Sequence, residues 1–74
     1  MKNIEQLQQD LIDAGFKKLT IRKAYEEAPD NEELKNGWFI ACYIENVAFL
    51  ALQEATSLTE TADFYSENVL KYFI

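Results

Sequence analysis

The sequence contains no histidine, one cysteine, one proline and two glycines among its 74 residues. Without histidine, the chain lacks the commonest general base and a preferred ligand of transition metals. Because Cys42 is the only thiol, an intrachain disulfide is excluded and a structural zinc site has no ligand set. Gly15 and Gly37 alone cannot make a glycine-rich phosphate loop. We therefore expect no enzymatic activity, no metal and no cofactor.

Long hydrophobic runs are also missing. The two longest, Trp38–Ile44 and Val47–Leu52, are interrupted by Glu45 and Asn46. Even joined, they are shorter than the ~20 apolar residues that a membrane-spanning helix needs. The first five residues contain no apolar signal-peptide region. These absences predict a soluble, cytoplasmic protein that does not enter a membrane.

The composition that remains is globular and acidic. Hydrophobic residues make up 49% and charged residues 27%, which predicts one small acidic domain over residues 1–74. The net charge is −6, and residues 24–74 carry ten carboxylates against only Lys35 and Lys71. An acidic surface repels phosphate backbones and attracts basic protein surfaces. We expect a protein partner with a basic surface and no direct binding to nucleic acid.

Two helices are expected at the ends of the chain. Asn3 and Gln6 form a capping-box pattern, and apolar residues at helical spacing follow until Gly15, which we expect to end the first helix. Ser57 and Glu60 repeat the capping-box pattern at the start of the second helix. The apolar face of that helix consists of Leu58, Ala62, Tyr65, Val69 and Tyr72.

The sequence pattern predicts three strands in the middle of the chain. Alternation predicts a strand over Leu19–Glu26, and aromatic and branched residues predict two more over Trp38–Ile44 and Val47–Leu52. Turns are expected at Asn36–Gly37 and Glu45–Asn46. The predicted fold class is α+β, in the order helix–strand–strand–strand–helix, with both helices on one face of a three-stranded antiparallel sheet. The alternative for the last two strands is one buried helix from Trp38 to Gln53.

Two surfaces are candidates for partner binding. On the second helix, Glu60, Asp63 and Glu67 share a narrow sector opposite the apolar face, and the first helix adds Asp10 and Asp13. Such a row of carboxylates can imitate phosphates, although an ordinary solvated face is the simpler interpretation. The predicted hairpin is apolar on both faces, with Trp38 and Tyr43 on opposite sides. Because two helices cover only one face, we expect the other to bind a second copy or another protein.

These features suggest a non-enzymatic, protein-binding module. Its size, its acidity and its lack of catalytic groups resemble the small inhibitors that phages and mobile elements use against host defence, including anti-CRISPR proteins. That resemblance implies a nucleic-acid mimic that occupies a basic, nucleic-acid-binding surface of its target. One alternative is a homodimeric structural or adaptor subunit with a sheet-mediated interface. Another is an enzyme or RNA binder that uses the basic cluster from Lys17 to Lys23.

Overall fold

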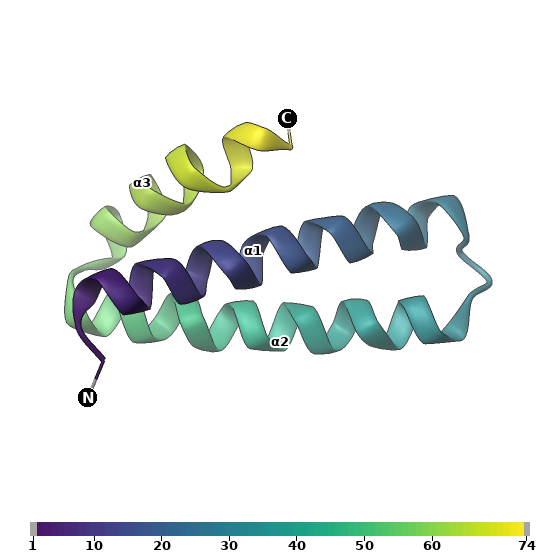
Figure 1. Ribbon diagram of the computed structural model, residues 1–74, viewed down its shortest axis with the longest axis horizontal. Helices are drawn as coiled ribbons and strands as arrows, with labels where there is room; N and C mark the ends of the chain where they lie inside the picture. Colours follow the sequence, from purple (N-terminus) through teal and green to yellow (C-terminus); the bar gives the residue numbers. More distant parts are fainter. Residues whose placement is uncertain (1, 74) are drawn as a thin grey trace.

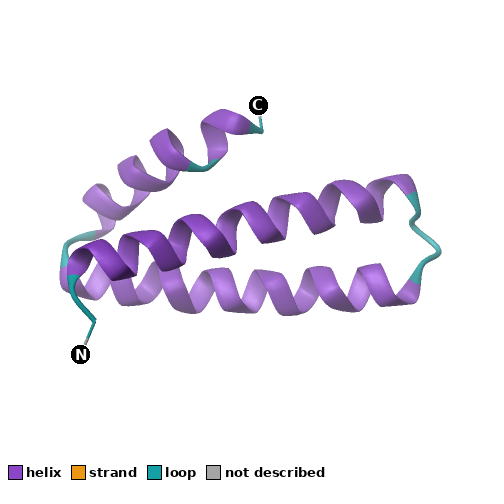
Figure 2. Cartoon of the chain, in the orientation of Figure 1, coloured by secondary structure: helices purple, strands orange, loops and turns teal. Residues whose placement is uncertain are grey.

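The computed structural model describes residues 2–73, which fold into helices joined by short loops (Figures 1 and 2). Helix α1 spans Ile4–Glu27, α2 spans Glu32–Ala55 and α3 spans Leu58–Asn68. A short 3-10 helix, Leu70–Tyr72, follows α3. The predicted α+β class is therefore wrong, because residues 2–73 contain no strand and no sheet.

Each α-helix begins at a side chain that satisfies a free backbone N–H group. The Asn3 side chain accepts a hydrogen bond from the Gln6 N–H group at 2.9 Å, and the Gln6 side chain accepts one from the Asn3 N–H group at 3.0 Å. This is the capping box predicted from the sequence. Ser57 likewise accepts from the Glu60 N–H group at 3.1 Å. The cap of α2 is Asn31, which accepts from the Leu34 N–H group.

Helices α1 and α2 lie side by side and antiparallel, and α3 turns back at Thr56 and Ser57 to pack on one side of the pair (Figure 1). One close contact with α1 is made at Gly15, where a Cβ atom would stand only 2.7 Å from Cγ1 of Val69, the C-cap residue of α3. The small core consists of Leu11, Ala14, Leu19, Ala41, Leu52 and Val69, together with the buried Thr61.

The molecule is thin. Its Cα atoms extend 39 × 26 × 16 Å, and two packed helices, with axes about 8–10 Å apart and Cα radii of about 2.3 Å, already span roughly 13–15 Å between their outermost Cα atoms. A molecule of this thickness has room for two layers of helix but not for three. Because α3 packs on one side of the α1–α2 pair, the other side has no covering layer among residues 2–73.

The three predicted strands lie inside helices. Leu19–Glu26 belongs to α1, and both strands of the predicted hairpin belong to α2. The alternative of one buried helix over Trp38–Gln53 is correct in its secondary structure, although α2 extends beyond it at both ends and is exposed along one side. The inward-facing side chains of α2 recur every three or four residues, which is the period of a helix. They are Leu34, Trp38, Ala41, Glu45, Ala48 and Leu52.

The predicted turns are helical as well. Gly15 lies in the middle of α1 and not at its end, and among the described residues no backbone has positive φ. Asn36–Gly37 and Glu45–Asn46 are interior positions of α2. The real break between α1 and α2 is the loop that contains Pro29, which lacks an N–H group and cannot continue a helix.

Candidate protein-binding surface

Helix α2 exposes an unusually apolar face to solvent. Tyr43 is 70% exposed, Ile40 61% and Phe39 53%. Three more large apolar side chains on the same helix are between 45% and 49% exposed, namely Ile44, Val47 and Leu50. At 3.6 residues per turn these six positions occupy one continuous sector of about 140°. We call these six residues the α2 face.

No charge interrupts the α2 face. Between Lys35 and Glu54 the only charged residue is Glu45. Its carboxylate points inward, since it accepts a hydrogen bond from Lys18 of α1 and another from Tyr65 of α3. Contiguous apolar surface of this kind marks interaction sites in soluble proteins, because isolated monomers seldom expose it.

A groove between α1 and α2 continues the α2 face toward α1. It encloses about 460 Å³, and Ile44 and Val47 belong both to its lining and to the α2 face. Its floor is completed by small or apolar side chains, Leu7, Ala14, Ala48 and Ala51. Its rim is charged and mixed in sign, with Lys2, Asp10, Asp13 and Lys17. None of the residues of α3 that the structure describes lines this groove.

Lys18, Glu45 and Tyr65 tie the three helices together. Lys18 Nζ lies 2.8 Å from Glu45 Oε1, and the Tyr65 hydroxyl donates to Glu45 Oε2 at 2.6 Å. Lys18 also lies 5.9 Å from the centre of the Tyr65 ring. Burial, and then the hydrogen bond and charge of Glu45, raise the pKa of Tyr65 well above its ordinary value of 10.0.

This polar cluster explains why the α2 face points outward. If α2 rotated about its axis, the Glu45 carboxylate would leave both partners and two half-buried polar groups would lose their hydrogen bonds. Such a loss is costly, because a buried charged group without a partner keeps its full desolvation penalty. The three side chains bind one another and line neither groove of the described chain, so we interpret the cluster as structural.

The carboxylates expected to bind a partner are placed as follows. Glu60, Asp63 and Glu67 are all exposed on α3, as anticipated. Asp13 is exposed and accepts a hydrogen bond from Gln9, whereas Asp10 is half-buried and forms an ion pair with Lys2 at 2.6 Å. Asp10 and Asp13 thus lie on the groove rim, apart from the acidic residues of α3.

The two aromatic candidates are separated by the structure. Tyr43 is the most exposed member of the α2 face. Trp38 is half-buried on the inner side of α2, where its ring lies 5.7 Å from that of Tyr25. The other five residues of the α2 face were not singled out from the sequence. The signal that would have found them is the stretch from Asn36 to Gln53, whose only charged residue is Glu45, when its apolar positions are grouped with a helical period.

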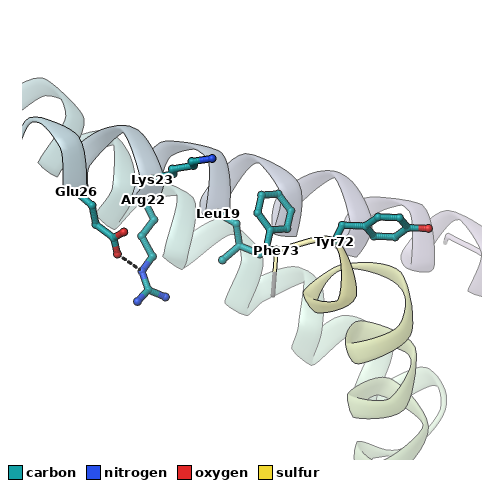
Figure 3. A pocket seen from close by; sticks show the side chains of 6 residues that line it. All are labelled: Leu19, Arg22, Lys23, Glu26, Tyr72 and Phe73. Atoms are coloured by element: carbon teal, nitrogen blue, oxygen red, sulfur yellow. Dashed lines mark hydrogen bonds and ion pairs between the residues drawn. The ribbon is translucent and has the colours of Figure 1, made fainter.

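The basic cluster is divided between two roles. Lys18 is engaged by Glu45, and Arg22 pairs with Glu26 one turn along α1 at 3.1 Å. Arg22, Lys23 and Glu26 line a second groove with Leu19 and with Tyr72 and Phe73 near the end of the chain (Figure 3). The negative charge of Glu26 partly neutralises the positive charges of Arg22 and Lys23, so this open groove would bind an anion only weakly.

Comparisons with protein-family models, with curated proteins and with solved structures return no match. None of the helices between residues 2 and 73 has both the length and the hydropathy needed to span a membrane. Over the same residues, no group of three or more histidine, cysteine or acidic side chains is placed to hold a metal ion.

Proposed function

We propose that this chain is a non-enzymatic, protein-binding module and that it binds through the α2 face. The observation that carries the proposal is the exposure of six large apolar side chains on one face of a helix with no charged residue among them. Burying apolar surface contributes roughly 25 cal/mol per Å². A partner that covers the α2 face therefore gains most of its binding free energy there.

The shape of the surface indicates what kind of partner segment fits. The groove beside the α2 face runs between two antiparallel helices, and it has an apolar floor and a charged rim. An amphipathic helix docks on such a surface by placing its own apolar stripe against the floor. Alanines at positions 14, 48 and 51 allow that helix to approach closely.

A pull-down with identification of the captured protein tests the proposal. The α2-face variant Ile40→Glu with Val47→Glu adds two charges to exposed positions, so it should fold normally and lose the partner. The matched control, Thr20→Glu with Ser66→Glu, adds the same charge at exposed positions outside the α2 face and should keep the partner. A partner that the α2-face variant captures as well as the wild type does would refute the proposal.

A second candidate function is an acidic inhibitor of the anti-CRISPR kind, which would cover a basic, nucleic-acid-binding surface. The observation that favours it is the solvent exposure of Glu60, Asp63 and Glu67 along one side of α3. The triple variant Glu60→Gln, Asp63→Asn and Glu67→Gln keeps the shape of the side chains and removes three charges. If this mechanism operates, the triple variant loses the partner and the wild-type interaction weakens steeply with salt. If the α2 face alone binds, neither change occurs.

A further inference from the structure

We infer that the α2 face binds an amphipathic helix of a different protein, one that carries Lys or Arg near both ends and an uncharged apolar stripe between them. This inference rests on the proposed function and specifies the partner of the same surface. The charges that border the α2 face are acidic at both of its ends and cancel along the groove.

Both ends of the α2 face carry carboxylates. Glu32 and Glu33 precede it in the first turn of α2, and Glu54 follows it near the end of the helix. At about 100° per residue, all three positions fall within the angular sector of the α2 face. Their side chains are exposed, and within residues 2–73 none of them has an ion-pair partner. They are therefore available to positive charges of a partner.

Lys35 does not cancel the charge at the N-terminal end. It lies about 40° outside the sector of the α2 face. Asp30, Glu32 and Glu33 against Lys35 leave residues 30–35 with a net charge of −2. At the other end, the partial negative charge of the helix C-terminus adds to the charge of Glu54.

The middle of the surface carries no net charge. The α2 face itself is uncharged, and the groove rim beside it has two groups of each sign. Lys2 and Asp10 pair at 2.6 Å, and Asp13 and Lys17 carry opposite charges on the same rim. A partner charge placed against the apolar floor would lose hydration without gaining a net counter-charge. The complementary helix is therefore uncharged in its middle.

The spacing of the carboxylates sets the spacing of the basic residues in the partner. Glu33 and Glu54 are 21 residues apart in α2, which is about 30 Å along the axis at 1.5 Å per residue. A helix that lies along α2 rises by the same amount per residue, so its basic residues should be roughly 20 positions apart.

A second copy of the chain does not supply this pattern. If the α2 faces of two copies were centred on each other with α2 antiparallel, residues 30–35 of each chain would lie near Glu54 of the other. If the two helices ran parallel, each end would meet its own equivalent. Like net charge faces like at both ends in either case, and the net charge of −6 adds to the repulsion.

The exposed area fits a reversible complex. Six side chains of this size, each about half exposed, contribute on the order of 500 Å². With an equal area on the partner, on the order of 1,000 Å² is buried, which is the lower end for specific interfaces. We expect micromolar affinity, to which the charges at the two ends contribute measurably.

Fluorescence anisotropy with two synthetic helical peptides tests the inference. Each peptide is as long as α2, 24 residues, and has the same stripe of leucine and alanine. One carries lysines in its first and last turns, and the other carries glutamates there. The lysine-ended peptide should bind roughly tenfold more tightly at low salt, and the difference should shrink as salt is added.

A pair of charge-matched variants shows whether the ends of the α2 face cause this preference. The variant Glu32→Gln, Glu33→Gln and Glu54→Gln should bind the two peptides with affinities within about twofold of each other. The matched control removes three charges from α3 instead and should keep the preference; its changes are Glu60→Gln, Asp63→Asn and Glu67→Gln. Circular dichroism checks that both variants fold and that both peptides are equally helical.

A lysine-ended peptide that fails to bind, or that binds no better than the glutamate-ended one, overturns the inference. So does an equal loss of preference in both triple variants, because net charge alone would then explain it. The α2-face variant, Ile40→Glu with Val47→Glu, tests the proposed function separately. If it loses both peptides while the wild type shows no preference, the proposed function stands and only the inference fails. If it retains both, the proposed function fails as well.

Discussion

At Gly15, α1 lies close to Tyr65 of α3 and to Val69, the residue that caps α3. A Cβ atom there would stand 2.7 Å from Cγ1 and 3.1 Å from Cγ2 of Val69, and 3.2 Å from Cε2 of Tyr65. Val69 is fully buried and its branched side chain has little rotational freedom, so it cannot move aside cheaply. The glycine is therefore retained for close packing of helix on helix, and its backbone has an ordinary helical conformation.

This contact predicts opposite effects for the two glycines of the chain. Gly15→Ala gains helix propensity of about 1 kcal/mol but overpacks the core at a cost of roughly 1–3 kcal/mol, so we expect a net loss of about 1 kcal/mol. Gly37→Ala is the matched control. Its Cβ would meet only Ile21 Cγ2, at 3.9 Å, and we expect a gain of up to about 1 kcal/mol. Urea denaturation measures both, and an equal rise in stability for the two variants would contradict the tight contact.

At the scale of the elements, the cluster of Lys18, Glu45 and Tyr65 fixes how α1, α2 and α3 are oriented. Tyr65→Phe removes only the hydroxyl group that reaches Glu45 at 2.6 Å. We expect a loss of roughly 1–2 kcal/mol in the free energy of unfolding at neutral pH, as for a hydrogen bond to a charged group. Tyr43→Phe is the control, because its ring is 70% exposed and the change should stay within about 0.5 kcal/mol.

The same hydroxyl predicts a dependence on alkaline pH. Because the folded state raises the pKa of Tyr65, the unfolded chain loses this proton first, at pH values near 10.0. The contribution of the hydroxyl is fully present below that pH and decreases as the pH rises above it. The difference in stability between wild type and Tyr65→Phe should therefore shrink above pH 10. A difference that stays constant to higher pH would mean that Tyr65 is not held by Glu45.

The starts of α1 and α3 were predictable from sequence, whereas the middle of the chain, including the start of α2, was not. Asn3 with Gln6, and Ser57 with Glu60, are local signals that act within one turn, and both caps are present. The stretch from Trp38 to Leu52 is apolar at nearly every position, so neither a two-residue nor a 3.6-residue period stands out. Tertiary contacts favour the helix over the strands in this stretch. Glu45 finds Lys18 and Tyr65 only when α2 is continuous through Asn46.

The candidate surface could be predicted in part. The sequence correctly indicated that residues 38–52 carry more apolar surface than so short a chain can cover, and it named Tyr43. It assigned that surface to a sheet, which the structure lacks over residues 2–73. It also assigned Trp38 to the interface, whereas the structure places Trp38 half-buried against Tyr25. That stacking depends on an α1–α2 contact that no local sequence pattern reveals.

At the scale of the whole molecule, charge and apolar surface are segregated. The exposed carboxylates of α3 lie apart from the groove, and the α2 face beside that groove is uncharged. We propose that another protein covers the side of this thin, two-layer molecule that α3 leaves open. We therefore propose above all that the α2 face is buried whenever this chain binds a partner, whether that partner is a second copy or a different protein.

Hydroxyl-radical footprinting of the bound form tests this claim most directly. It reports the solvent exposure of individual aromatic side chains, and Phe39, Tyr43 and Tyr72 are all well exposed in the single chain. In the complex, modification of Phe39 and Tyr43 should fall several-fold relative to the isolated chain, while Tyr72 near the far end of α3 should be modified to the same extent as before. Unchanged modification of Phe39 and Tyr43 in a confirmed complex would show that the partner binds elsewhere and would contradict the account.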